Sequence, residues 1–169
     1  LAQQCLAPEQ IAGVGLANQG ESLLLWDRAT GEPVYNLIGW QCTRSLDVCQ
    51  RLHAGGLAAD FTARTGLQVH PEWPATKVPW VLEHVPDARR LLEQGRLAFS
   101  MGDAWLLYQL SHGEFFISDH STASRSGIRS RCARTAAGSV SCNADADSCI
   151  ADSTNRAIRC VGTSAVPRY

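Results

Sequence analysis

The chain has 169 residues, a length that suits one domain with a sizeable core. Its 15 basic and 16 acidic residues leave a net charge of −1, which argues against nucleic acid and against an acidic membrane surface as partners. No apolar run approaches the roughly 20 residues that a membrane-spanning helix needs, and residues 1–10 carry no signal-peptide pattern. The seven cysteines are therefore interpreted as reduced thiols of a cytoplasmic protein.

The strands that organise the domain are predicted in the amino-terminal part of the chain. Residues 11–16 alternate β-branched with small residues and carry no charge, a pattern typical of a strand buried on both faces. Residues 22–26 show a similar apolar run, and residues 27–31 supply the turn for an antiparallel return that ends at Trp40. The polar residues 18–21 therefore follow a buried strand at its carboxyl end, where open α/β sheets bind ligands.

Helices and short strands alternate through the middle of the chain. Caps, apolar spacing and terminal glycines predict helices over residues 44–54 after Thr43, 57–65, 75–85, 87–94 and 104–110 after Asp103, and the end of another helix within residues 1–10. Short strands are predicted over residues 97–100 and 114–119. Strands that alternate with helices predict an α/β fold.

The composition changes at about Arg129. From there to Tyr169 the chain has no Trp, Phe, Leu or Met, but it has six arginines and four of the seven cysteines. Its apolar residues follow neither the helical nor the strand period, so residues 129–169 are predicted to be an irregular Cys/Arg/Ser-rich tail without an assigned role. A small thiol- or metal-binding appendage is the alternative, although the four cysteines are too irregularly spaced for a zinc knuckle.

Two segments, IAGVGLANQGES and LLLWDRATGEPVYNLIGWQCTR, resemble the amino-terminal domain of the FGGY family of carbohydrate kinases, and within it the glycerol kinases most closely. The segment from Glu72 to His84 follows a signature of that family except at Glu72, and the likeness continues to about Gly127. The resemblance implies that residues 1–128 form part of a ribonuclease-H-like (actin-like ATPase) domain, incomplete in this chain, that binds the substrate.

Two residues become candidates for substrate binding through this resemblance. Glu21 takes the position of a glutamate that accepts hydrogen bonds from substrate hydroxyls, a task that suits an ionised acceptor. Trp40 takes the position of a tryptophan that packs its ring against the carbon skeleton of a polyol. From the residues alone, the alternatives are a solvated turn glutamate and a core tryptophan.

Two positions depart from the glycerol kinases of that family. Gly20 stands where they have Arg, and Glu72 stands where they have Tyr. A site with two carboxylates and no arginine is not expected to hold glycerol as those enzymes do, and the room at Gly20 favours a larger polyol or a sugar. The neighbouring Gln19 and Trp73 complete the predicted substrate-binding set. An exposed loop acid is the alternative for Glu72.

Other residues that match the family pattern are given structural roles. Lys77 and Trp80 are expected to position a helix and a loop rather than to do chemistry. Asp103 is explained as a helix cap. Ser124 and Arg125, in a segment that resembles the family's TDYTNASRT, are interpreted as architecture beside the cleft. No catalytic residue and no metal ligand is predicted in this chain.

The resemblance implies that the intact enzyme transfers a phosphoryl group of ATP, with Mg²⁺, to a hydroxyl of a polyol or sugar. The family's phosphate-binding loop and catalytic aspartate have no counterpart in this sequence. We therefore expect the chain alone to be an inactive part of such a kinase that binds neither cofactor. A non-enzymatic sugar-binding or regulatory remnant is the alternative, and a homo-oligomer of the intact enzyme is left open.

Overall fold

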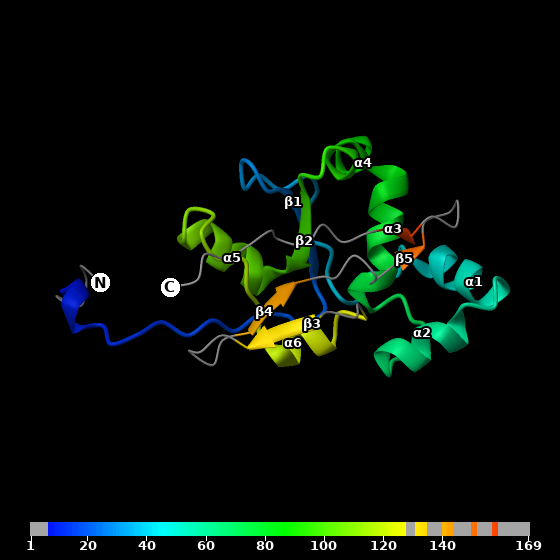
Figure 1. Cartoon of the computed structure of the whole chain (residues 1–169), viewed down its shortest axis with the longest axis horizontal. Helices are drawn as coiled ribbons and strands as arrows, with labels where there is room; N and C mark the ends of the chain where they lie inside the picture. The colour runs from blue at the N-terminus through cyan, green and yellow to red at the C-terminus, as the bar shows by residue number, and fades with distance from the viewer. Residues whose placement is uncertain (1–6, 128–130, 135–139, 144–149, 152–156, 159–169) are drawn as a thin grey trace.

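The computed structural model describes residues 7–127, 131–134, 140–143, 150–151 and 157–158 (Figure 1). Expectations for residues 1–6 and for the rest of the predicted tail lie outside the described residues. Within the described part, helices and strands are mixed, as the α/β prediction requires, and the best-packed region lies between residues 20 and 127.

A two-stranded antiparallel sheet forms the centre of this region. Strand β1 (Leu23–Asp27) pairs with strand β2 (Leu97–Met101) in a register that sets Leu23 opposite Met101 and Asp27 opposite Leu97. Both strands lie within one residue of their predicted bounds. All residues of β1 are buried.

The helices that surround this sheet are short. Within the described residues they are α1 (Leu46–Ala54), α2 (Ala58–Thr65), α3 (Pro74–His84), α4 (Pro86–Glu93), α5 (Gly102–Leu110) and α6 (His120–Ser124), preceded by a 3₁₀ turn, η2 (Pro8–Gln10). The first five were predicted to within a few residues. Gly66 ends α2 at a φ of 74°, a left-handed conformation that glycine adopts without strain.

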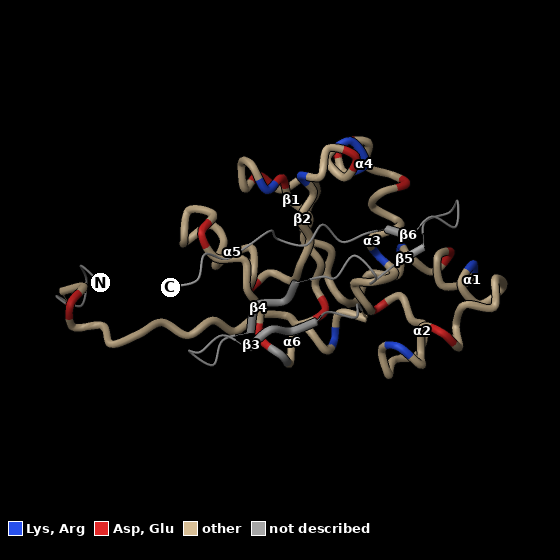
Figure 2. The backbone as a smooth tube through the Cα atoms, viewed as in Figure 1, with Lys and Arg blue, Asp and Glu red and all other residues tan. Residues whose placement is uncertain are grey.

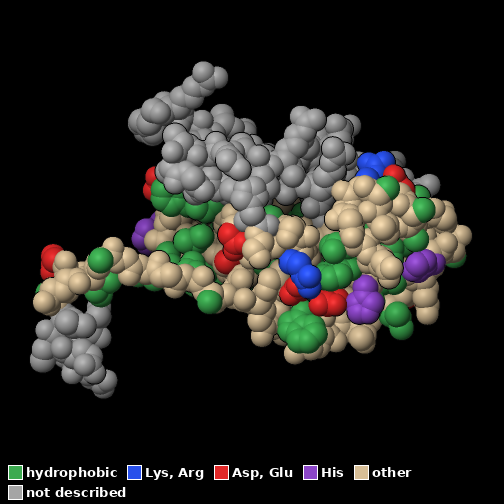
Figure 3. All heavy atoms as spheres, turned by 90° about the horizontal axis from the view of Figure 1, so that it is seen from below, with side chains coloured by type: hydrophobic (Ala, Val, Ile, Leu, Met, Phe, Trp, Pro, Cys, Tyr) green, Lys and Arg blue, Asp and Glu red, His purple; other side chains and the backbone are tan. Residues whose placement is uncertain are grey.

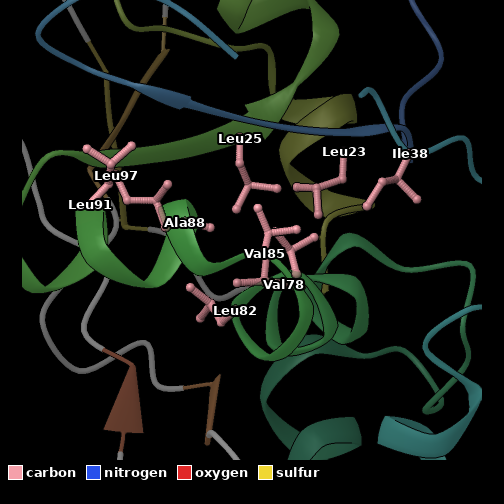
Figure 4. Packing of buried hydrophobic residues seen from close by; sticks show 10 residues of the cluster. Leu23, Leu25, Ile38, Val78, Leu82, Val85, Ala88, Leu91 and Leu97 are labelled. Atoms are coloured by element: carbon pink, nitrogen blue, oxygen red, sulfur yellow. The ribbon is translucent and has the colours of Figure 1, made fainter. Parts of the chain in front are cut away.

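Strand β1 is buried because both faces of the sheet are covered. On one face, Leu23 and Leu25 point into a cluster with apolar residues of α3 and α4 (Figure 4). On the other face, the ring centroid of Trp26 lies 6.0 Å from that of Tyr108 on α5 and 5.1 Å from that of Phe116. This two-sided burial explains why the strand is a continuous apolar run rather than an alternating one.

The predicted antiparallel return after β1 is present, although it forms no regular strand. The carboxylate of Asp27 accepts a hydrogen bond from the Ala29 N–H at 2.9 Å, and Gly31, with a φ of 77°, closes the turn. The returning chain meets β1 only at isolated bridges, Trp26 with Pro33 and Leu23 with Ile38. Because Pro33 has no N–H, it cannot continue a ladder of hydrogen bonds.

The prediction of a buried strand over residues 11–16 is wrong for this structure. These residues are exposed, with Val14 82% exposed, and they form no strand (Figure 1). A strand requires a partner for its N–H and C=O groups. No other strand of the described residues pairs with this segment, so its apolar pattern alone did not decide its burial.

Two helix starts differ from the prediction. Helix α1 follows Ser45 rather than Thr43, because the Thr43 carbonyl accepts a hydrogen bond from the Leu46 N–H at 3.0 Å and forms a separate turn. Helix α3 begins at Pro74, in the favoured first position for proline. Pro79 therefore lies inside this helix.

The segment around residues 103–119 also differs. Asp103 does not cap α5: the residue before the helix is Met101, and the Asp103 carboxylate instead accepts a hydrogen bond from the Ser118 hydroxyl at 2.6 Å. Residues 114–119 form no strand in the structure. Asp119 ends this stretch as the cap of α6, where its carboxylate accepts a hydrogen bond from the Thr122 N–H at 2.8 Å.

Within the predicted tail, the described residues form two antiparallel pairs. Strand β3 (Arg131–Arg134) pairs with β4 (Val140–Asn143), and β5 (Ile150–Ala151) pairs with β6 (Ala157–Ile158). Across the described ranges, no helix has both the length and the apolar character needed to cross a membrane.

The two-sided burial of β1 can be tested with Leu25→Ala. Leu25 is 1% exposed, so the truncation leaves a cavity and should lower the free energy of unfolding by about 2–5 kcal/mol in urea denaturation. Leu110→Ala is the matched control, because Leu110 is 64% exposed and its truncation should change stability by no more than about 0.5 kcal/mol. Equal effects of the two variants would contradict the described core.

Candidate functional site

Glu21 and Arg125, which are far apart in the sequence, form an ion pair at one edge of the domain. Glu21 lies two residues before β1, and Arg125 follows the last residue of α6. The Arg125 Nε donates to Glu21 Oε1 at 2.6 Å. The Glu21 side chain is 16% exposed and the Arg125 side chain 48%, so the pair faces solvent on the arginine side.

Helix α6 holds Arg125 in this place. The carboxylate of Asp119 accepts hydrogen bonds from the N–H and the hydroxyl of Thr122, both at 2.8 Å, and these bonds lower the pKa of Asp119. After the helix, the Ser126 carbonyl accepts a hydrogen bond from the Ala75 N–H at 2.9 Å. The end of α6 is therefore attached to the first turn of α3.

A glycine allows the chain to pass closely over the start of α3. Gly127 has a φ of 68°, and a Cβ at this position would lie 3.0 Å from the Cβ of Ala75, 3.2 Å from the Phe61 ring and 3.3 Å from the Cβ of Trp73. Any other residue would therefore be strained and crowded here. This close approach sets Arg125 beside the loop that precedes α3.

That loop carries the second carboxylate of the cluster. Glu72 Oε1 lies 3.9 Å from Arg125 Nη2, and the Arg125 guanidinium lies 5.0 Å from the centre of the Trp73 ring. The Glu72 N–H donates to His70 Nδ1 at 3.2 Å, which helps to fix the loop. Figure 2 shows acidic and basic positions from separate segments side by side next to α6, and Figure 3 shows this side of the molecule with acidic, basic and hydrophobic side chains in contact.

Lys77 connects this loop to the loop that carries Trp40. The Lys77 side chain is fully buried, and its ammonium donates to the carbonyl of Trp40 at 3.5 Å and to the carbonyl of Glu72. Burial lowers the pKa of Lys77 to about 8, although neighbouring groups such as Cys42 and Glu72 favour the charged form. One buried ammonium thus ties together the backbone of two predicted site residues.

Trp40 itself is 41% exposed, so it is not the buried core tryptophan of the alternative interpretation. Gln19 has a local role: its side-chain oxygen accepts a hydrogen bond from the Ser22 hydroxyl at 2.7 Å, which shapes the turn that presents Glu21. At Gly20, an added Cβ would meet no atom within 4 Å. The space predicted at Gly20 is therefore present.

A second polar cluster packs beside the Trp40 loop. Arg44 donates to Cys42 Sγ at 2.9 Å and to the Tyr35 hydroxyl at 3.1 Å, and its guanidinium lies 4.7 Å from the centre of the Trp80 ring. Burial raises the pKa of Cys42, but the hydrogen bonds and charge of Arg44 outweigh it, so the pKa is lowered. The ring of His84 stacks on Trp80 with centroids 4.3 Å apart. Trp80 thus has a packing role, as predicted.

Three of the six predicted site residues, Glu21, Glu72 and Trp73, meet around one arginine. The expectation that no arginine accompanies the two carboxylates is wrong, because Arg125 at the end of α6 lies 2.6 Å from Glu21 and 3.9 Å from Glu72. The sequence alone indicates a structural role for Arg125, because no short-range sequence pattern links this residue to Glu21. The sequence feature that came nearest to indicating this contact is the segment of residues 119–125, which resembles the family pattern and ends in Ser124 and Arg125.

The chemistry of this cluster suits a ligand rich in hydroxyl groups. Carboxylate oxygens accept hydrogen bonds, a guanidinium donates them, and indole rings offer apolar faces. Among the described residues, no group of three or more His, Cys, Asp or Glu side chains could hold a metal ion. We therefore assign no Mg²⁺ ligand to these residues.

Comparison with solved structures defines the class of protein. The structure is similar to glycerol kinase of Plasmodium falciparum solved with ADP, with a TM-score of 0.63 and 29% identity over 67% of this chain and 22% of that one. Gluconate kinase of Lactobacillus acidophilus aligns with a TM-score of 0.51 at 19% identity, over 63% of this chain and 20% of that one, which supports the fold alone. The domain has the ribonuclease-H-like, actin-like ATPase fold of sugar kinases.

Sequence comparison identifies the family. The profile described as "FGGY family of carbohydrate kinases, N-terminal domain" matches residues 1–130. This chain belongs to the FGGY family of carbohydrate kinases, as its sequence predicted.

Glycerol kinases are among the relatives of this chain. The chain is 41% identical to the glycerol kinase of Desulforamulus reducens over 135 residues, and 42% identical to that of Halothermothrix orenii over 120 residues. These matches cover 78% and 71% of this chain but only 27% and 24% of the relatives. The chain thus spans about a quarter of the length of the curated relatives it matches.

The buried ammonium gives a direct test of the site. Lys77 is the single lysine of the sequence, so ¹³C-labelled lysine gives one side-chain signal in NMR spectra. That signal should titrate at about pH 8 in the folded protein, and in urea close to the ordinary value of 10.5. A folded-state midpoint at or above the ordinary value would contradict the described burial.

The same pKa shift predicts how stability depends on pH. Between about pH 8 and 10.5 the unfolded chain binds the Lys77 proton more tightly than the folded one, so the contribution of this group to the free energy of unfolding should rise with pH. The Lys77→Met variant has no such group, and the difference between wild type and variant isolates the effect from other titrations.

Proposed function

We propose that the intact protein phosphorylates a hydroxyl group of a neutral polyol or sugar, and that this chain carries part of its substrate-binding surface. The residues assigned to that surface are Glu21, Trp40, Glu72, Gly20, Gln19 and Trp73. The observation that carries the proposal is the cluster of Glu21, Arg125 and Glu72 beside an indole ring, in a chain of the FGGY family.

The roles follow from the chemistry of each side chain. The carboxylates of Glu21 and Glu72 accept hydrogen bonds from ligand hydroxyls, and a hydrogen bond to a charged group contributes roughly 1.5–3 kcal/mol. Trp40 and Trp73 offer apolar ring faces to the carbon skeleton. Gln19 shapes the turn before β1, and Gly20 leaves room for a ligand larger than glycerol.

The glycerol kinases similar to this chain support phosphoryl transfer as the reaction of the intact enzyme. ATP with Mg²⁺ would supply the phosphoryl group there. The described residues contain no group suited to a metal ion, and we assign no residue of this chain to either cofactor and no catalytic role. A cytoplasmic location and a homo-oligomer of the intact enzyme belong to the same proposal.

The binding role of Glu21 can be tested by calorimetry with a panel of glycerol, erythritol, xylitol and xylulose. Wild type should release or absorb heat with at least one of them. Glu21→Gln should weaken that binding roughly tenfold or more, because it removes a charged acceptor. Glu93→Gln on α4, an exposed position, is the matched control and should bind as wild type does. Absence of heat with every compound would overturn the proposed substrate site.

A phosphotransfer assay of the purified chain with ATP and the same panel tests whether this chain is active without the rest of the enzyme. We expect no turnover above background, because we assign no catalytic base to this chain and the loss of such a base typically costs about 10²–10⁴ in rate. Turnover above background would overturn the proposal that the chain is inactive alone. Binding without turnover is also what a non-enzymatic sugar-binding domain would show, so the reaction itself must be tested in the full-length protein.

A further inference from the structure

We infer that Arg125 is a substrate-binding residue, and that its Nη2 and Oε1 of Glu72 together bind one hydroxyl group of a neutral polyhydroxy ligand. The inference rests on the proposed function, because it concerns the same surface. It adds Arg125, which the sequence pattern marks as a structural residue, to the hydrogen-bond donors of this surface. It also specifies the class of ligand that the surface selects.

The spacing of the two atoms is the first argument. Arg125 Nη2 and Glu72 Oε1 lie 3.9 Å apart, which is too long for a direct hydrogen bond. An oxygen about 2.8 Å from each atom spans this gap with good hydrogen-bond lengths. That oxygen must accept from the guanidinium and donate to the carboxylate, and a hydroxyl group can do both.

The second argument is that the guanidinium is already fixed. Its Nε donates to Glu21 at 2.6 Å, and its Cζ lies over the Trp73 ring, 5.0 Å from the ring centre. These contacts leave the side chain 48% exposed, so its terminal nitrogens can meet a ligand from solvent. A donor that is held in place before binding loses little conformational freedom on binding.

The charges of the cluster give the third argument. Glu21 and Glu72 face Arg125, and the buried ammonium of Lys77 lies beneath the same loop. The two negative and two positive groups balance when Lys77 is protonated, so the cluster has no net positive charge that would attract an anionic ligand. A sugar acid would bring its carboxylate, which has no proton to donate, towards Glu72. The site should therefore bind a neutral polyol in preference to the sugar acid of the same length.

The experiment compares wild type with Arg125→Gln by calorimetry, using xylitol, or the neutral polyol that wild type binds best, and the sugar acid of the same length. Arg125→Gln should weaken neutral-polyol binding roughly tenfold to a hundredfold, as expected for a lost charged hydrogen bond. Arg90→Gln is the matched control: Arg90 is 54% exposed and pairs with Asp87 at 3.0 Å on α4, away from the cluster. It should leave binding unchanged.

Two further variants separate a ligand contact from a purely structural role. Arg125→Lys keeps the charge and can pair with Glu21, but one ammonium does not reproduce the fork of the guanidinium, so affinity should fall while stability is kept. In the Arg125→Gln background, Gly20→Arg introduces a new cation where a side chain has open space, and it should restore part of the lost affinity. Gly20→Arg in the wild-type background is the control, because a gain there as large as in the Arg125→Gln background would show that the new cation acts independently of Arg125.

The outcomes distinguish the two proposals. Absence of heat from wild type with every neutral polyol overturns the proposed function, and the role of Arg125 with it. Binding by wild type that Arg125→Gln and Arg125→Lys leave unchanged overturns the role of Arg125 alone. If Arg125→Gln does not fold by circular dichroism, the folded Arg125→Lys variant decides. A sugar acid that binds wild type as tightly as the neutral polyol also overturns the inference.

Discussion

The arrangement of the candidate site depends on one buried charge. Lys77 belongs to α3, whose Val78 and Val81 are buried in the core cluster beside β1, and the packing of that helix fixes where the ammonium lies. From there it donates to the carbonyls of two irregular loops, those of Trp40 and Glu72. Each loop also has one turn of its own: the Cys42 N–H donates to the Gly39 carbonyl at 3.1 Å, and the Trp73 N–H donates to the His70 carbonyl at 3.3 Å. A charge that burial takes out of water must be satisfied by polar groups, so the ammonium of Lys77 links these two loops to α3.

The two ion pairs at the ends of β1 illustrate the difference between a structural contact and a candidate ligand contact. At the far end, Asp27 pairs with Arg96 and accepts the Ala29 N–H. Burial raises the pKa of Asp27, but these hydrogen bonds outweigh it and the pKa is lowered. This pair joins the turn after β1 to the start of β2 and has a sufficient structural explanation.

At the near end, the Glu21–Arg125 pair joins elements that packing already holds together. An ion pair whose arginine is half exposed contributes little to folding stability, about 0–1 kcal/mol. Its neighbours are unlike those of the Asp27 pair, because a second carboxylate and an indole ring lie against the guanidinium. The difference in surroundings, rather than in pair geometry, is what favours a ligand here.

The sequence predicted the elements whose structure is decided locally. The apolar run of β1, the glycine that ends α2 and the proline at the start of α3 act within a few residues, and the structure has them close to the predicted positions. The strands predicted over residues 11–16 and 114–119 are absent, because an apolar pattern cannot supply the neighbouring strand that must pair with it. The candidates Glu21 and Trp40 came from family resemblance, which carries information that periodicity does not. Arg125 was missed because its contact with Glu21 spans the whole domain.

If Arg125 binds the ligand as we infer, affinity depends on the junction that places this residue at the end of α6. Arg125 is placed by the bond between Ser126 and Ala75 and by the close passage of Gly127 over Trp73. A side chain at position 127 would meet Ala75, Phe61 and Trp73 within 3.3 Å, and Trp73 is the residue whose ring lies 5.0 Å from the Arg125 guanidinium. A hydrogen-bond donor at position 20 would not depend on residues 126 and 127, because the turn at position 20 leads directly into β1. Under the proposed function, the open space at Gly20 gives a ligand more room, and the only guanidinium described beside Glu21 is one placed by the junction between residues 126–127 and the start of α3.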